Sequence, residues 1–394
     1  RLAEALISFT RAYATAPMTL VSHMGMMTGL RQSRHGVDKD QALSPDIPTL
    51  AERLAAIGYD TVALFFKGWI HERFGYDRGF RVFQPHPDWR GAAAHMEEHF
   101  AQPTTEPFFL FLHLFDAHSA DLRKRGSTMY EAPAPFDTMF QADATDVLAA
   151  AAAQGMTAHA LWNGGMKATP EVIEAATALY DGAIANLDHQ VGAWLDRFAQ
   201  QGILDNSIVI VTADHGESLG QRGGEMRGHG DMFEEGLRVP LLVRLPGGRK
   251  GGLEVTTPVS HVDIVPTVLE ATGLDLDPWL EGTSLTDRQK PGRLVWSEMN
   301  GNIAVYRWPW KLRAKLNAPG GVLVNLETDP RELSPMTRRT DPRAYDRLRD
   351  GLVTAMERDI AGRPDPGATA VVAGSATAAE TAELRALGYL EETE

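Results

Sequence analysis

The sequence predicts an α/β fold: a mostly parallel β-sheet flanked by helices, followed by a small antiparallel sheet and a helix. Three observations support this class. Short apolar runs alternate with amphipathic helical segments, which is typical of βαβ units. Several runs are continuously apolar, as in strands covered on both faces. After about residue 285 the strand-like segments become closely spaced, which indicates antiparallel pairing.

The first part of the chain supplies the larger layer of helices and strands. The segment Thr49–Glu52 has the pattern of a capping box, and it opens a helix that ends at Gly58. A long amphipathic helix begins at Pro170 and ends near Gly202. We interpret the alanine-rich segment 144–165 as an insertion that covers one face. The predicted buried strands are 60–66, 107–115, 207–213 and 239–245.

We divide the chain into a catalytic α/β domain, residues 1–285, and a C-terminal α+β subdomain with a tail helix, residues 286–394. The strand-like segments of the subdomain read "LVWSEM", "IAVYRWPWKLRAKL" and "GVLVNLETDP". A helix near 343–358, a linker rich in glycine, alanine and proline (361–378) and the terminal helix "AAETAELRALGYL" follow.

Composition narrows the classes of function. The 394 residues carry a formal net charge of −14, which argues against nucleic acid and anionic membranes as partners. An anionic substrate would then require a locally positive site, such as a metal ion. The absence of cysteine excludes disulfides, thiolate metal sites and a cysteine nucleophile. No apolar run approaches the length of a membrane span, and the compartment stays open.

The segment "VIVTADHGE" places Asp214 and His215 directly after a predicted strand. Ligands of parallel sheets bind at the carboxyl ends of the strands. A carboxylate and an imidazole on one rigid turn can hold a divalent metal ion together, and Gly216 permits the sharp turn. The alternative is that Asp214 and His215 only cap a helix.

Three more histidines stand near predicted strand ends or on glycine-rich loops. His118 falls just past the second strand, whereas we interpret His113 as a core residue in the middle of that strand. Asp116 is either a helix cap or a partner of a site residue. His229 lies between two glycines on a loop, where packing gives little reason for a histidine, so we expect it to contact substrate.

Together these stretches resemble the sulfatase family of the alkaline phosphatase superfamily. The resemblance rests on "FLHLFDAH", "TADHGESLG", "GHGDMFEEGLRVPLLVRLPG", "SHVDIVPTVLEATG", "LVNLETDPRE" and "LRALGYL". It extends from about residue 1 to the end of the chain. It implies an alkaline-phosphatase-like fold and metal-dependent hydrolysis of sulfate or phosphate esters.

The family's nucleophile opens a short motif followed by a helix that ends in "TG", and Thr19–His23 and "MMTGL" match these two parts. At a helix N-terminus Thr19 would face an anion-binding position; the alternative is that Thr19 is only an N-cap. His23 either replaces the arginine of the motif or packs the helix. The resemblance implies roles for these residues: Thr19, His118 and His229 in catalysis, Ser22 and His23 in substrate binding, and Thr19, Asp214 and His215 in metal binding.

The chain also departs from the family pattern. Threonine cannot be converted to formylglycine, and a threonine nucleophile resembles the phosphodiesterase and phosphoethanolamine-transferase branches. The resemblance implies one divalent metal ion (Ca, Zn or Mn) and leaves a second ion open. Family members carry acidic ligands on a strand upstream of the nucleophile, but here only Glu4 precedes Thr19. It lies in "LAEALISFTRAYA", which we predict to be the helix after that strand. We expect a fragment rather than a metal-deficient protein.

The sequence therefore predicts a metal-dependent hydrolase that acts on a small-molecule, glycan or lipid ester through a covalent Thr19 intermediate. One alternative is a phosphoryl-group transferase, although such enzymes usually carry membrane helices. Another is a catalytically degenerate binding module without a complete metal site. We expect the catalytic and metal-binding residues to converge at one end of the sheet: Thr19, His118, Asp214, His215 and His229.

Overall fold

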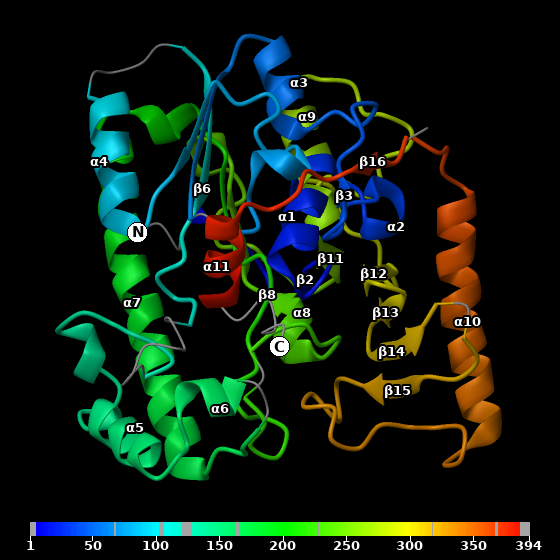
Figure 1. Cartoon of the computed structure of the whole chain (residues 1–394). Coiled ribbons are helices and arrows are strands. Elements are labelled where there is room, and N and C mark those ends of the chain that lie inside the picture. The colour runs from blue at the N-terminus through cyan, green and yellow to red at the C-terminus, as the bar shows by residue number, and fades with distance from the viewer. Residues whose placement is uncertain are drawn as a thin grey trace.

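The computed structural model describes residues 5–66, 68–101, 106–119, 128–162, 165–226, 228–316, 318–366 and 369–386. It confirms the α/β class. Helices α4 (Trp89–His99) and α7 (Pro170–Gln200) lie along one side of the sheets, and α10 (Pro342–Ala361) lies along the opposite edge of the molecule (Figure 1). Among the described helices, none combines the length and the apolar character that a membrane span requires.

One sheet is entirely parallel. Its central strand β4 (Asp60–Phe65) pairs with β5 (Val82–Pro85) on one side and with β6 (Phe108–His113) on the other. Strand β4 is almost fully buried, as predicted, whereas the side chains of β6 are only half-buried. In the described part of the chain β6 is an edge strand of this sheet, and its side chains on both faces are less buried than its apolar sequence indicates.

The predicted third and fourth strands belong to a mixed sheet. Strand β9 (Leu241–Arg244) runs antiparallel to both of its neighbours, β1 (Ile7–Phe9) and β7 (Val209–Thr212), and β1 pairs in parallel with β10 (Glu254–Val255). A short third sheet is also mixed, with the order β11 (Val259–Ser260), β2 (Ala12–Tyr13) and β8 (Arg238–Val239).

The prediction of a helix across "LAEALISFTRAYA" is wrong for the residues that the structure describes there. This segment forms β1 and β2 instead. Ile7 and Phe9 are buried and Ser8 between them is half-buried, which is the two-residue period of a strand. Residues 1–4 lie outside the described residues.

Two predicted helices begin and end close to the expected positions. Thr49 caps α3 (Leu50–Ala56) with both hydrogen bonds of a capping box. Helix α1 (Thr19–Thr28) is buried along its whole length, and Gly29 ends it with a φ of 72°, a left-handed conformation that favours glycine.

The alanine-rich segment covers one face of the molecule, as predicted. It forms α5 (Ala144–Ala153) and α6 (Ala158–Trp162), which bury Leu148 and Leu161 against α7. In Figure 1 these helices lie below the parallel sheet, around the lower end of α7.

The C-terminal strands form the predicted antiparallel sheet in the order β12 (Val295–Met299), β13 (Asn302–Arg307), β14 (Trp310–Lys315) and β15 (Val322–Asn325). Helix α10 packs on one face of this sheet. On the other face, Tyr306 stacks on Tyr13 of β2 with ring centroids 3.8 Å apart. The boundary near residue 285 stays a prediction.

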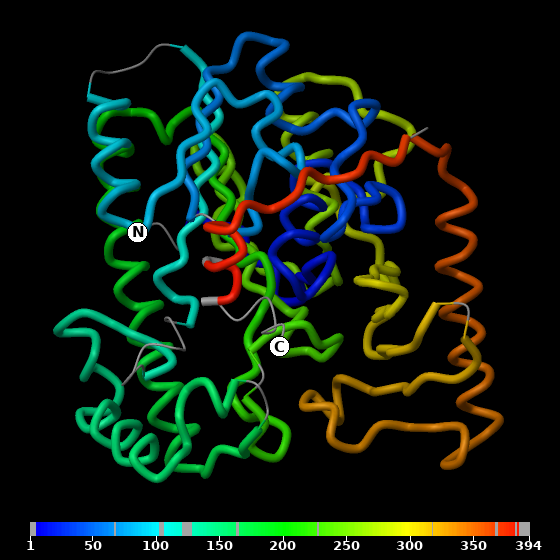
Figure 2. The backbone as a smooth tube through the Cα atoms, viewed as in Figure 1, coloured from blue at the N-terminus to red at the C-terminus, as the bar shows by residue number. Residues whose placement is uncertain are grey.

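The segment predicted to be a linker contains a short strand. Strand β16 (Val371–Val372) pairs with β3 (Gln41–Ala42), and Figure 2 shows this last segment crossing back from α10 to the centre of the molecule. The tail helix α11 (Ala378–Ala386) buries Leu384 in the core cluster that contains residues of α1. Residues 387–394 lie outside the described residues.

Candidate active site

Thr19 is the first residue of the buried helix α1. The N-cap is Met18, so Thr19 does not cap the helix. Its side chain is 4% exposed. The first N–H groups of a helix have no partners within the helix and, together with its dipole, favour a bound anion. The helix thus presents a hydroxyl at a position suited to a sulfate or phosphate group.

Asp214 and His215 follow β7 and lie beside Thr19. Nε2 of His215 is 3.3 Å from Oγ1 of Thr19 and 3.5 Å from Oδ2 of Asp214. Nδ1 of His215 lies 2.9 Å from the carbonyl oxygen of Gly216. Since a carbonyl only accepts, Nδ1 carries the proton, and in the neutral ring Nε2 directs a lone pair toward Thr19 and Asp214.

The Asp214 carboxyl is held ionised by its surroundings. Burial alone would raise its pKa, whereas positive charge on the imidazoles of His215, His23 and His113 would lower it and a hydrogen bond from the Thr19 hydroxyl lowers it further. The net result is a pKa well below the usual range of a carboxyl group. A charged carboxylate is therefore present to hold a cation.

A second group of possible ligands shares the same carboxylate. Ligand atoms of His23, His113 and Asp214 all lie within 4.8 Å of one another. His113 is the last residue of β6, so the prediction that it lies in the middle of the strand is wrong. Nδ1 of His23 donates to the carbonyl oxygen of Thr19 at 3.0 Å and lies 3.5 Å from Oδ2 of Asp214. His23 thus links the backbone of Thr19 to Asp214.

His118 and His229 complete the cluster. The ring of His229 lies 4.5 Å from that of His215 and 5.7 Å from that of His118. Burial lowers the pKa of His118 to about 4 and that of His229 well below its usual value, so both rings are neutral. Trp162 of the insertion packs against both, with ring centroids at 6.1 and 5.6 Å.

The structure brings together all five residues that we expected to converge, but it gives two other residues different surroundings. Ser22 is fully buried, and its hydroxyl donates to the backbone carbonyl of Asp214 at 2.6 Å. Asp116 accepts a long hydrogen bond from the N–H of Trp89, the first residue of α4, at 3.4 Å. Asp116 therefore faces a helix end.

The sequence motifs gave no role to two residues near the cluster, the buried His261 and the partly buried Glu217. His261 lies 3.2 Å from the hydroxyl of Ser22. Glu217 accepts a hydrogen bond from the Tyr130 hydroxyl at 2.9 Å, and burial raises the pKa of Glu217 to about 7. Their motifs, "SHVDIVPT" and "DHGE", were visible in the sequence, but no spacing rule links them to Thr19.

The residues around Thr19 fit a divalent metal ion. Thr19 Oγ1, His215 Nε2 and Asp214 Oδ2 all carry lone pairs, and the hydroxyl brings the one proton that they share. Their separations of 3.3 and 3.5 Å match the distance of about 3.4 Å between ligands about 2.1 Å from a tetrahedral metal ion. A cation placed between these three groups would interact favourably with the lone pairs of each.

Fold and site together define an α/β protein with a hydroxyl at a helix N-terminus and, beside it, an Asp-His pair that fits a metal ion. The Sulfatase family model matches residues 1–274 of the chain. The chain belongs to the sulfatase family. The choline-sulfatase of Rhizobium meliloti (strain 1021) is 30% identical over 178 residues, which cover 42% of this chain and 34% of that protein. The chain spans about a third of the length of the curated relatives it matches.

Solved structures share the fold over nearly the whole chain. The phosphonate monoester hydrolase of Agrobacterium radiobacter superposes with a TM-score of 0.67 at 20% identity, covering 91% of this chain and 89% of that one. A structure solved in complex with its substrate D-glucosamine-2-N,6-O-disulfate superposes with a TM-score of 0.66 at 17% identity, covering 93% of both chains. These likenesses confirm the predicted alkaline-phosphatase-like architecture.

Proposed function

We propose that the protein is a metal-dependent hydrolase of sulfate or phosphate esters and that Thr19 is its nucleophile. One observation carries this proposal. The Thr19 hydroxyl, at the N-terminus of a buried helix, lies 3.3 Å from a histidine whose lone pair faces it. A residue that only capped the helix would stand at the position of Met18, one residue before Thr19. Membership in the sulfatase family supports the reaction class.

Thr19, Asp214 and His215 would hold the metal ion. When bound, the ion would lower the pKa of the threonine hydroxyl and offset negative charge on the substrate. An imidazole ligand favours Zn or Mn over Ca, which prefers oxygen ligands only. Nδ1 of His23 donates its proton to the Thr19 carbonyl, so this nitrogen is not a ligand of the ion.

The chain's own groups then carry the reaction. Oγ1 of Thr19 attacks sulfur or phosphorus in line with the ester oxygen, the bond to that oxygen breaks, and the leaving alkoxide takes up the proton that the Thr19 hydroxyl gives up. The N–H groups of the neutral His118 and His229 rings donate hydrogen bonds to the substrate's oxygens and stabilise the charge on them. Water then attacks the ester on Thr19, releases sulfate or phosphate and restores the hydroxyl.

The names of similar proteins indicate the range of substrates. One relative is a choline-sulfatase, and one structural neighbour was solved with a sulfated glucosamine. A phosphonate monoester hydrolase shares the fold. We infer a small-molecule or glycan ester as substrate. Because a threonine ester lacks the geminal diol through which formylglycine releases sulfate, we expect phosphate esters to be turned over at least as fast as sulfate esters.

Metal removal tests the proposal. The full-length protein would be stripped with a chelator and assayed on paired aryl phosphate and aryl sulfate substrates before and after addition of Zn²⁺, Mn²⁺ or Ca²⁺. We expect activity to disappear on stripping and to return with Zn²⁺ or Mn²⁺. A full-length protein that binds no divalent ion and hydrolyses neither ester would instead be a binding module.

A further inference from the structure

The buried imidazole of His261 joins two elements of the candidate site that are far apart in sequence. The side chain is fully buried, directly after β11. Its Nδ1 lies 3.2 Å from Oγ of Ser22 in α1, and its Nε2 lies 3.2 Å from Oγ1 of Thr212 at the end of β7. One ring therefore bridges the helix that carries Thr19 and the strand that precedes Asp214.

The hydrogen bonds around this ring have a defined direction. Ser22 uses its only hydroxyl proton on the Asp214 carbonyl at 2.6 Å, so the Ser22 oxygen accepts from Nδ1–H of His261. On the other side of the ring, the Thr212 hydroxyl has two acceptors within reach, the Pro240 carbonyl at 2.7 Å and Nε2 of His261 at 3.2 Å. The bond from Nδ1–H of His261 to Ser22 and the bond from Ser22 to the Asp214 carbonyl form a chain in which each bond strengthens the next.

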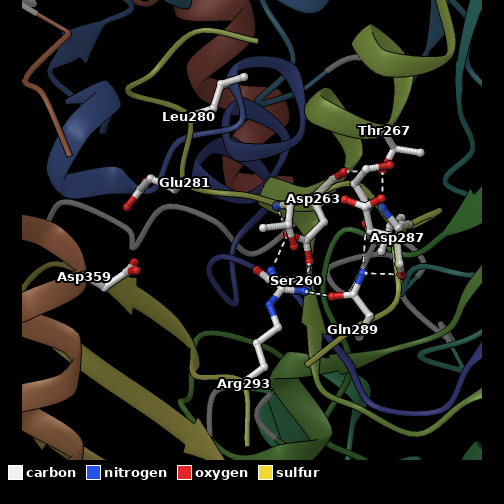
Figure 3. Close-up of polar contacts among 12 residues, drawn as sticks. Ser260, Asp263, Thr267, Leu280, Glu281, Asp287, Gln289, Arg293 and Asp359 are labelled. Atoms are coloured by element: carbon white, nitrogen blue, oxygen red, sulfur yellow. Dashed lines mark hydrogen bonds and ion pairs between the residues drawn. The ribbon is translucent and has the colours of Figure 1, made fainter. Parts of the chain in front are cut away.

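A buried ion pair holds the turn that carries His261. Asp263 has no exposed surface, and both of its oxygens accept from the guanidinium of Arg293, at 2.5 and 2.8 Å (Figure 3). The same carboxylate accepts from the backbone N–H groups of Ser260 and Thr283, each at 2.8 Å. Four donors saturate the carboxylate, so this pair fixes the turn His261–Asp263 in one orientation.

We propose that His261 is a positioning residue that sets the distance between the Thr19 hydroxyl and the Asp214 carboxylate through Ser22. The proposal rests on the proposed function, because it assumes that these two groups act together. Substitutions of residues that orient metal ligands typically cost 10–100-fold in metal affinity or activity. His261 touches neither substrate nor the reacting atoms, so its effect should fall on kcat and metal affinity and leave KM nearly unchanged.

The variants separate positioning from packing. The amide of His261→Asn reaches the place of Nδ1 and can still donate to Ser22, whereas the amide of His261→Gln reaches toward Thr212. We expect His261→Ala and His261→Gln to lower kcat about 10–100-fold and His261→Asn to recover most of it. Ser22→Ala should cause a similar loss, and the Ser22→Ala/His261→Ala double variant should lose little more than either single variant. Ser297→Ala, which removes another fully buried hydroxyl, controls for loss of stability.

The measurements are kcat and KM on an aryl ester, the dissociation constant of Mn²⁺ by calorimetry and the Tm of the full-length protein. A kcat for His261→Ala within twofold of wild type would overturn the proposal. The proposal would also be overturned if His261→Asn and His261→Gln had the same kcat, or if Ser297→Ala lost as much kcat as His261→Ala. If the wild type binds Mn²⁺ but hydrolyses no ester, only the proposed function fails. In that case His261→Ala must still lower the affinity for Mn²⁺ about 10–100-fold, and an unchanged affinity would overturn the inference about His261. A wild type that neither binds Mn²⁺ nor hydrolyses an ester contradicts both the proposed function and the inference about His261.

Discussion

Oγ1 of Thr19 lies 3.3 Å from Nε2 of His215, across 196 residues of sequence. The contact joins the first residue of a buried helix to the turn after strand β7. Because Nδ1 of His215 donates to a backbone carbonyl, the facing nitrogen is the one with the lone pair. This relationship gives Thr19 a neighbour that can share a metal ion with it, and the predictions below depend on it.

Asp214→Asn should remove metal binding and turnover together. The substitution keeps the size of the side chain but removes the charge that holds the cation. We expect metal affinity to fall by more than about 100-fold, beyond the loss typical of residues that only orient ligands. Metal content by plasma mass spectrometry and turnover of an aryl ester measure the effect, with the exposed Asp205→Asn as control. Wild-type metal content in Asp214→Asn would exclude Asp214 as a ligand.

Gly228→Ala should impair catalysis through Trp162. A Cβ at Gly228 would lie 2.3 Å from the Trp162 ring, and this ring packs against His118 and His229. We expect a loss of kcat of at least about tenfold, because displaced catalytic groups lose their alignment with the substrate. Gly292→Ala is the matched control, since Gly292 has a similar positive φ but open space at its Cβ. Equal activities of the two variants would contradict this role of Trp162.

Acid should destabilise the protein partly through His35, which lies outside the candidate site. Burial lowers the pKa of His35 to about 3, whereas an unfolded histidine has a pKa of about 6.5. The stability that depends on neutral His35 is fully present above pH 6.5 and is lost as the pH falls toward 3, because the unfolded chain binds the proton first. Between pH 7 and 5 this amounts to about 2 kcal/mol.

The variant His35→Asn isolates this contribution. Its amide oxygen can replace Nδ1, which accepts from the N–H of Val37 at 3.0 Å. Urea unfolding at pH 7 and 5 should show a smaller loss of unfolding free energy in His35→Asn than in wild type, by about 2 kcal/mol. The exposed His189→Asn should behave like wild type. The same loss in all three proteins would mean that His35 does not set the acid sensitivity.

The residues of the candidate site that lie in short sequence motifs could be predicted from the sequence. Asp214 and His215 were recognised because they follow a strand and precede a glycine. The sequence did not predict β1 or the role of His261, because both depend on distant partners. Ile7 pairs with Val243 of β9, and His261 meets Ser22 across 239 residues. His113 was misplaced because an apolar run does not mark where a strand ends.

The substitution Thr19→Ala, measured for turnover and metal content in the same preparation, tests the central claim most directly. We expect kcat on aryl phosphate and aryl sulfate to fall at least about a thousandfold, as for the loss of other nucleophiles. Bound metal should stay near the wild-type level, since Asp214 and His215 remain. Thr19→Ser, which keeps the hydroxyl, should retain measurable turnover. If Thr19→Ala keeps near wild-type activity on either substrate, Thr19 is not the nucleophile.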